Sequence, residues 1–304
     1  MELKEARYIL SIYKNKTISK AAEELYISQP SLSKYLKNME KQLGQPLFDR
    51  INNEYVPTFI GERYVHYAQR IVSSGLEWLH EFNDLTQQDI GRINLALPVM
   101  LGNTIIEPTL AHFYLQYPNV EINLMEEVHF VSEHFLEDHT VDLVLYNVPN
   151  PPDFLDYEIL RKEEIVMIVS KKNPLAYLGE PREGFAHPWV DIKYFKDQSF
   201  IMLYPDQTTG GLAENLFKVN EIEPNILLRT RNSQLSIQLA IQNVGISFAP
   251  ESYFNALNKD GQSVCLSVGD KPMYTTLIAG YLKNRYMPNY TKAYLELIKA
   301  YCRK

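Results

Sequence analysis

The sequence predicts a multidomain protein of the α+β class. Its 304 residues, of which 45% are hydrophobic, supply more apolar material than one core uses, so we expect about two domains. Apolar residues recur at helical spacing in residues 1–58 and continue into one long helical stretch over residues 59–90. Over residues 91–304, strand-like runs alternate with helical stretches, which is typical of an α/β domain.

The net charge of −7 is unevenly distributed along the chain. Residues 1–58 carry nine Lys and Arg against seven Asp and Glu, a net of +2, whereas residues 59–90 carry two against five, a net of −3. Residues 91–304 carry 19 against 25 and account for −6. An evenly spread negative charge would oppose binding to phosphates. Because the N-terminal part is weakly basic, the charge excludes only strong non-specific coating of nucleic acid.

The sequence shows no secretory signal, no membrane span and few cysteines, and these three observations bear on the cellular compartment. The charged opening from Met1 to Arg7 is unlike a secretory signal, and no run approaches the ~18 apolar residues of a membrane span. Cys265 and Cys302 are too few for a disulfide framework or a cysteine-based zinc site. We therefore expect a cytoplasmic protein with no membrane partner, and we interpret both cysteines as packing residues.

The first 58 residues predict three helices with a tight turn between the second and the third. Thr17 and Ser28 are the expected N-caps of these two helices, and Pro30 fits the first turn of the third. The expected inward-facing residues are Tyr8, Ile9, Ile12 and Tyr13 in the first helix, Ala21, Ala22 and Leu25 in the second, and Leu32, Leu36 and Met39 in the third. The outward face of the third helix presents Gln29, Ser31, Ser33, Lys34, Lys37 and Asn38.

This arrangement is typical of a helix-turn-helix, whose second helix can lie in a major groove of DNA. Gln and Asn side chains can pair with adenine edges, Lys reaches guanine or phosphate, and Ser can donate to phosphate. A solvated helix of a small helical bundle is the alternative interpretation, and the pattern alone leaves it open.

The residues from Ile18 to Glu40, ISKAAEELYISQPSLSKYLKNME, resemble the signature of LysR-type transcriptional regulators, as does LGQPLFDR from Leu43 to Arg50. Order and spacing agree over more than thirty residues. The resemblance implies a winged helix-turn-helix over residues 1–58, with Gly44 as a helix C-cap and Leu47-Phe48 as wing packing. It implies these DNA-binding residues: Gln29, Pro30, Ser31, Ser33, Lys34, Lys37 and, at the wing beside the turn Asn52-Asn53, Arg50.

Position 34 departs from the family pattern, in which Arg is frequent. Lys34 replaces a planar, bidentate fork with a single point charge. We therefore expect Lys34 to contact phosphate rather than to read a base.

Residues 59–90 predict a long helix, with Thr58 as its N-cap. Its apolar residues Tyr64, Ala68, Ile71, Gly75, Trp78, Phe82 and Leu85 are spaced alternately by four and three, as in a heptad seam. One interpretation is an amphipathic helix that lies on its own domain. The resemblance instead implies a linker helix that pairs between subunits, and we predict dimerisation, with Gly75 as a weak point or a place of close approach.

The region 91–304 predicts a parallel or mixed sheet. The expected strands are 92–98, 120–124, 141–146, 165–169, 200–203 and 245–250, and the expected helices are 105–117, 234–242 and 289–301. Asn243 can adopt the left-handed conformation that ends the second of these helices.

The phrases Tyr117-Pro118-Asn119, Val141-Asp142-Leu143, Lys172-Asn173-Pro174-Leu175 and Gly245 to Pro250 resemble the effector-binding region of the same family. The resemblance implies a two-lobed α/β effector domain, similar to type 2 periplasmic binding proteins. Lobe one would comprise about 91–162 and 268–304, and lobe two about 163–267.

The resemblance also implies a small, usually anionic effector held between the lobes, near helix starts. Many members offer Ser or Thr directly after the first strand, whereas this chain has Val99 and Met100. This departure suggests a ligand larger or less anionic than a simple carboxylate. The candidate effector-binding residues are Met100, Asn103, Thr104, His129, Ser132, Tyr204, Gln207, Thr208, Thr209 and Asn232, each with a turn or cap role as its alternative interpretation.

Signatures of catalysis are missing from the sequence. It contains no Gly-x-Gly-x-x-Gly, no Gly-x4-Gly-Lys-Ser/Thr and no Gly-x-Ser-x-Gly motif. His129, His134 and His139 are five residues apart, a spacing that places neighbours ~140° apart on a helix, so we expect no metal site and no cofactor.

We therefore predict a DNA-binding transcriptional regulator controlled by an effector, and not an enzyme. The alternatives are a solute-binding transport protein and an enzyme built on the same two lobes. The predicted partners are double-stranded DNA with a pseudo-palindromic operator, a small-molecule effector, further copies of the chain in a dimer or tetramer, and RNA polymerase.

Overall fold

The structure is a computed structural model that describes residues 2–86, 89–126, 140–150, 155–283 and 285–303. The chain folds into two compact units, the first ending at Asp89 and the second beginning at Ile90. In the described residues, no helix has the length and apolar character that a membrane crossing needs.

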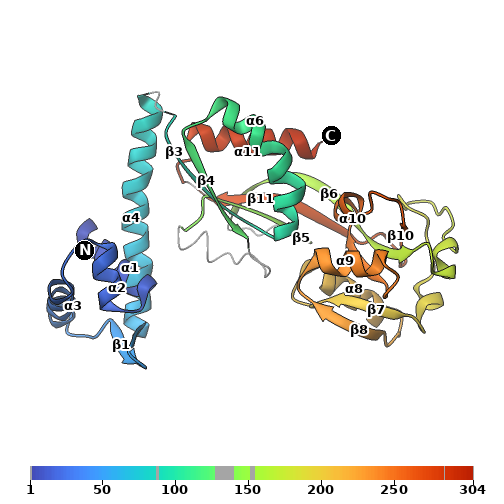
Figure 1. Cartoon of the computed structure of the whole chain (residues 1–304), viewed down its shortest axis with the longest axis horizontal. Helices are drawn as coiled ribbons and strands as arrows, with labels where there is room; N and C mark the ends of the chain where they lie inside the picture. Colours follow the sequence, from blue (N-terminus) through green and yellow to red (C-terminus); the bar gives the residue numbers. More distant parts are fainter. Residues whose placement is uncertain (1, 87–88, 127–139, 151–154, 284, 304) are drawn as a thin grey trace. The chain divides into compact units, whose positions relative to one another are not determined.

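Within the described residues, the first unit contains four helices and a two-stranded hairpin (Figure 1). Its elements are α1 (Leu3–Asn15), α2 (Ile18–Glu24), α3 (Gln29–Leu43), β1 (Phe48–Ile51), β2 (Glu54–Pro57) and α4 (Phe59–Leu85). The three predicted N-caps are confirmed, because the Thr17, Ser28 and Thr58 side chains accept hydrogen bonds from the first turns of α2, α3 and α4. Gly44 ends α3 with φ 69°, the left-handed conformation expected of a C-cap.

The core of this unit lies between α1, α2, α3 and the first half of α4. It contains most of the predicted residues, including the adjacent alanines of α2, and it adds Val65 of α4. The expectation for α1 was wrong at one end of the stripe, because Tyr13 is 41% exposed while Ala6 is buried instead. Tyr8 is half-buried and meets Tyr35 of α3 edge to face, with ring centroids 4.9 Å apart.

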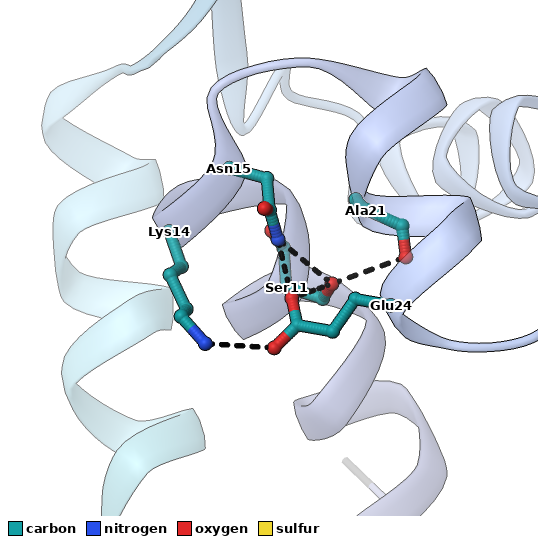
Figure 2. Close-up of polar contacts among 5 residues, drawn as sticks. All are labelled: Ser11, Lys14, Asn15, Ala21 and Glu24. Atoms are coloured by element: carbon teal, nitrogen blue, oxygen red, sulfur yellow. Dashed lines mark hydrogen bonds and ion pairs between the residues drawn. The ribbon is translucent and has the colours of Figure 1, made fainter.

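A polar network joins the ends of α1 and α2, as Figure 2 shows. Glu24 accepts hydrogen bonds from Lys14 at 2.8 Å, from the Ser11 hydroxyl at 2.9 Å and from Asn15. The Ser11 hydroxyl also lies 3.2 Å from the Ala21 carbonyl oxygen. The hydrogen bond from Lys14, followed by those from Ser11 and Asn15, holds the pKa of Glu24 below its usual range against the opposing effect of burial. The network therefore ties α2 to α1 most firmly when Glu24 is ionised.

Glu24→Gln is expected to destabilise α2 at neutral pH and to have little effect in acid. Because the folded pKa is lowered, the stabilisation is present above the unfolded pKa of about 4.3 and is lost as the pH falls through the folded value. Glu24 is partly exposed, so the loss at pH 7 should be about 1 kcal/mol or less. Amide hydrogen exchange of α2 at pH 7 and at about pH 2.5, below the folded pKa, measures this loss, with the exposed neighbour Glu23→Gln as control. An equal loss at both pH values would contradict the assignment.

The heptad pattern on α4 is divided between two environments. Ala68 is fully buried and Tyr64 packs against the same core, because α1 lies along this half of α4. Gly61 at the start of α4 allows the close approach of the segment before β1, because a Cβ there would lie 1.8 Å from the Leu47 carbonyl oxygen. The core of the first unit therefore covers the first half of the predicted seam, whereas Trp78 and Phe82 in the second half are exposed. Pairing of this seam between subunits stays a prediction.

The second unit is built on a mixed sheet. Its strands are β3 (Gly91–Leu97), β4 (Val120–Glu126), β5 (Leu143–Val148), β6 (Leu155–Ser170), β7 (Ser199–Leu203), β8 (Asn225–Thr230), β9 (Ser247–Pro250), β10 (Ser263–Leu266) and β11 (Tyr274–Leu282). Its α-helices are α5 (Val99–Leu101), α6 (Glu107–Gln116), α8 (Thr208–Val219), α9 (Ser233–Ile241), α10 (Glu251–Leu257) and α11 (Asn289–Cys302). A π-helical stretch, Gly102–Ile106, connects α5 to α6, and Asn243 follows α9 with φ 65°, as predicted.

The strand order in the main sheet is β10-β6-β11-β5-β3-β4, with β9 also paired to β6. β3 is parallel to both β4 and β5, whereas β11 is antiparallel to β5 and β6. The strand predicted over 165–169 is much longer, because the first part of β6 pairs with β11 and its last part with β9 and β10. The strand predicted over 141–146 begins later, at Leu143.

Two aromatic-rich cores support this unit. In the first, Phe113 of α6 packs against Tyr294 of α11 with ring centroids 4.6 Å apart, and both helices lie beside the sheet (Figure 1). In the second, Phe200, Phe217 and Phe248 join β7, α8 and β9. β6 contributes to both cores and so links them.

Candidate functional site

The exposed face of α3 is the first candidate site. Leu32, Leu36 and Met39 are buried, so the remaining faces of the helix point to solvent. Of the residues predicted to approach DNA on this helix, Ser33 is half-buried, whereas Gln29, Pro30, Ser31, Lys34 and Lys37 are exposed. The Ser28 hydroxyl caps the first turn through the Ser31 backbone N–H at 3.3 Å, which sets the direction in which α3 begins.

The hairpin after α3 is a short wing. β1 and β2 pair antiparallel, and Asn52 and Asn53 connect them with φ 50° and 65°, as a two-residue hairpin turn of type I′ requires. The exposed Arg50 guanidinium donates to the Asn53 side-chain oxygen at 3.3 Å. Arg50 is thus placed on the wing, as expected.

Glu40 positions the wing, a role that the sequence reasoning missed. Its Oε1 accepts hydrogen bonds from the backbone N–H groups of Leu47 at 2.8 Å and Phe48 at 3.3 Å. The Tyr55 N–H also donates to the Lys16 carbonyl oxygen at 2.7 Å, which ties the second strand to the end of α1. The Glu40 contacts span seven and eight residues and the Tyr55–Lys16 contact spans 39, so neither follows from helical or strand periodicity. These contacts hold the hairpin beside α3. The exposed face of α3 and the hairpin together present the basic residues Lys34, Lys37 and Arg50.

The carboxyl ends of β3, β4 and β5 form a second candidate site. Because these strands are parallel and adjacent, the residues that follow them meet at one edge of the sheet. Met100 is buried in the core, and the Thr104 hydroxyl donates to the Met100 carbonyl oxygen at 2.8 Å. Asn103 is exposed. Of the three residues predicted here, only Asn103 has its side chain directed to solvent.

The start of α8 contacts this edge. The Thr208 hydroxyl donates to the Asn147 carbonyl oxygen at the end of β5 at 2.8 Å, and Thr209 is buried. Gln207 precedes α8, and its Nε2 donates to the Arg231 carbonyl oxygen at 3.1 Å. Asn147 was missed from the sequence, because only the sheet order places it beside α8.

Tyr204 and Asn232 lie around the same helix start. The Arg231 guanidinium stands over the Tyr204 ring, 4.6 Å from its centroid, and pairs with Asp206 at 2.7 Å. The Asn232 side chain caps α9 by accepting from the Leu235 N–H at 3.0 Å, which is the cap role that the sequence left open. The predicted residues His129 and Ser132 lie outside the described residues.

The two cysteines are free. Cys265 Sγ lies 3.5 Å from His187 Nδ1, and burial raises the pKa of its thiol to about 11, helped by the carboxylates of Glu251 and Glu164. Burial also raises the pKa of Cys302. Neither thiol is therefore activated as a nucleophile. The described part of the chain also contains no group of three or more His, Cys, Asp or Glu side chains that could hold a metal ion.

Both units match known protein families. Residues 3–62 match the model described as bacterial regulatory helix-turn-helix protein, lysR family, and residues 86–303 match the LysR substrate binding domain. The HTH-type transcriptional regulator YcgK of Bacillus subtilis is 28% identical, over 98% of this chain and 94% of its own length. CfxR of Cupriavidus necator, also an HTH-type transcriptional regulator, is 24% identical, over 90% of this chain and 83% of its own.

Solved structures share the fold over the whole chain. A full-length OxyR variant from Pseudomonas aeruginosa superposes with a TM-score of 0.71 at 17% identity, over 100% of this chain and 95% of that one. Full-length CbnR complexed with its target DNA gives a TM-score of 0.63 at 16% identity, over 99% of this chain and 100% of that one.

Proposed function

The chain belongs to the LysR family of bacterial transcriptional regulators, and we propose that it binds a pseudo-palindromic operator through α3 and the wing. The observation that carries the proposal is the outward face of α3, where Gln29, Lys34 and Lys37 are all exposed. In this proposal Gln29 reads a base edge, and Lys34, Lys37 and the serines hold phosphates. Arg50 on the wing reaches the adjacent backbone or groove.

Self-association supplies the second half of the operator contact. The second half of α4 presents Trp78, Leu79 and Phe82, which are 59%, 50% and 45% exposed. Side chains of this size on one helix favour a second copy of the chain as their partner. A dimer carries two α3 helices, which require half-sites a helical turn or a multiple of it apart.

The double variant Trp78→Ser, Phe82→Ser is expected to shift the protein from dimer towards monomer and to weaken operator binding at least tenfold. Sedimentation measures the first effect and DNase footprinting the second, with the wild type protecting two half-sites. Tyr177→Ser, which removes a ring that is 70% exposed in the second unit, is the control. Protection of one isolated half-site by a wild-type monomer would overturn the proposal.

We further propose that the effector binds where the ends of β3, β4 and β5 meet the start of α8. The candidate residues within the described part of the chain are Met100, Asn103, Thr104, Tyr204, Gln207, Thr208, Thr209 and Asn232. The Thr208–Asn147 contact supports this location, because it joins two segments with separate cores. An effector that separates these segments would alter the spacing of the recognition helices.

The remaining partners follow from the family. We propose that the protein acts in the cytoplasm, contacts RNA polymerase at its promoter and catalyses no reaction; its relatives are transcriptional regulators. A gel-shift assay with the DNA upstream of its own gene tests the function as a whole. Absence of any shifted species would contradict it.

A further inference from the structure

The second unit contains an open pocket with a volume of about 650 Å³. Three segments line it: residues 170–175, which begin at the end of β6, residues 194–199, which lead into β7, and residues 243–246, which lead into β9. The Ile246 N–H donates to the Ser199 carbonyl oxygen at 2.9 Å, which holds the last two segments together. The volume lies within the range that small-molecule sites occupy.

This pocket is separate from the proposed effector site. β7 begins at Ser199 in the pocket, whereas the effector candidates Tyr204 and Gln207 follow its other end. β9 is parallel to β7, as the bridge between Phe200 and Ile246 shows, so both strands begin at the pocket. The pocket and the proposed effector site therefore lie at opposite ends of β7.

Two hydrogen-bond donors lie together in the pocket. Asn173 Oδ1 accepts from the Leu175 backbone N–H at 3.0 Å, so the Asn173 amide must present Nδ2 to Gln198. Gln198 Oε1 accepts from this Nδ2 at 2.8 Å, which leaves Gln198 Nε2 as a donor without a partner among the described residues. Lys172 directly precedes Asn173, is exposed and forms no ion pair with a described carboxylate. An amide N–H and an ammonium on the same side of a pocket favour an anionic group.

Tyr194 supplies an aromatic surface to the same pocket. It belongs to the 3₁₀-helix Ile192–Phe195, whose two end residues are buried in the second core and so hold the Tyr194 backbone in place. The Tyr194 side chain is 65% exposed and contacts no other ring of the described chain. Leu175 and Val244 add apolar surface to the lining. A planar ring stacked on Tyr194 would remove apolar surface of both rings from water.

From the two donors and the unpaired ring, we propose that this pocket is a second small-molecule site. Its ligand carries one planar ring, which stacks on Tyr194, and one anionic group, a carboxylate or a phosphate, which Lys172 and Gln198 bind. The Asp197 carboxylate also lines the pocket and repels an anion, so the anionic group lies on the Lys172 side. The ligand contacts the starts of β7 and β9 without occupying the effector site. This inference goes beyond the proposed function and does not depend on it.

Ligand-observed NMR titrations of the full-length protein test the proposal with two sets of probes. In the carboxylate set, indole-3-acetate has both groups, indole-3-ethanol lacks the anion and acetate lacks the ring. In the phosphate set, adenosine monophosphate has both groups, adenosine lacks the anion and ribose phosphate lacks the ring. The complete member of one set is expected to bind at least about fivefold more tightly than either of its partial members. The set that shows this preference identifies the anionic group.

Variants of the lining residues locate the bound probe. Lys172→Gln should lower the affinity of the complete probe to that of the member without the anion, and Tyr194→Ala to that of the member without the ring. The matched controls are Lys193→Gln, an exposed lysine beside Tyr194 that does not line the pocket, and Tyr301→Ala, an exposed tyrosine of α11. Both controls should leave the affinity unchanged. Neither Lys172 nor Tyr194 lies in the DNA-binding unit, so their variants should retain operator binding.

Equal binding of the complete and partial members in both sets would overturn the inference, as would the absence of binding by every probe. Unchanged affinity in both Lys172→Gln and Tyr194→Ala would place the probe elsewhere and would also overturn it. A gel shift with the wild type separates this inference from the proposed function. Loss of operator binding with the probe preference retained refutes the proposed function alone, whereas operator binding without the preference refutes the second site alone.

Discussion

Gln29→Ala and Lys34→Ala should each abolish detectable operator binding while leaving the oligomer intact. Both side chains are exposed at the start of α3 and have no hydrogen-bond partner among the described residues, so the fold does not depend on them. The Lys34 variant loses a phosphate contact in each half-site. For Gln29, a good base contact contributes about 1–3 kcal/mol, and a dimer loses it in both half-sites. The combined loss of about 2–6 kcal/mol corresponds to roughly 30-fold to 10⁴-fold in affinity.

Gel shifts and size-exclusion chromatography measure the two expectations together. Lys41→Ala is the matched control, because Lys41 is an exposed lysine in the last turn of the same helix. Lys34→Arg should retain binding if Lys34 contacts phosphate. A plot of the logarithm of the binding constant against the logarithm of the salt concentration has a negative slope. Lys34→Ala should reduce the magnitude of this slope by about 0.9 for each phosphate that the lysine neutralises in the wild type. Unchanged affinity of both alanine variants would refute the assignment of α3 as the DNA-reading helix.

Asp142→Ala should lower the free energy of unfolding of the second unit by about 3–5 kcal/mol. Asp142 Oδ1 lies 3.0 Å from Arg285 Nη2, and Oδ2 accepts from the Asn94 backbone N–H at 2.8 Å and side-chain Nδ2 at 3.2 Å. The two charged side chains are only 16% and 13% exposed. Removing the carboxylate leaves the Arg285 charge nearly buried, together with a backbone donor that no longer has an acceptor.

Urea unfolding of the full chain, monitored by circular dichroism, measures this loss. The urea concentration at the midpoint of unfolding should fall, while the dependence of the free energy of unfolding on urea concentration should stay constant. The double variant Asp142→Ala, Arg285→Leu removes both charges and should recover a large part of the loss, since the penalty comes from leaving the nearly buried Arg285 charge without the Asp142 carboxylate. Glu296→Gln removes an exposed partner of Lys299 and should change stability by less than about 1 kcal/mol. Equal losses in Asp142→Ala and in the double variant would show that the ion pair is not the cause.

The structure agrees with the sequence wherever the interactions are local. The caps at Thr17, Ser28 and Thr58 involve residues three positions apart, and the conformations of Gly44 and Asn243 depend on their own backbone. The apolar spacing of α3 likewise determines which of its faces is buried. These features lie within a few residues of one another, so the sequence pattern contains the information needed to predict them.

The candidate effector site was predicted less completely. Gln207 and Thr208 were identified by their place after a strand, but Asn147 was not, because only the fold brings the end of β5 to the start of α8. Met100 was selected for its position after β3, and its side chain belongs to the core. The expectation from Val99-Met100, a ligand larger or less anionic than a simple carboxylate, stays a prediction.

The sequence by itself therefore determined the helices of the first unit, the polar outer face of α3 and the α/β character of the second unit, because short-range periodicity and capping specify them. The helix-turn-helix followed from the resemblance of residues 18–50 to the family. Tertiary structure alone decided that α1 covers half of the α4 seam, that Glu40 holds the wing, and that Asp142 meets Arg285. The physical reason is that these interactions join groups far apart along the chain, whose meeting depends on sheet order and helix packing rather than on any local spacing.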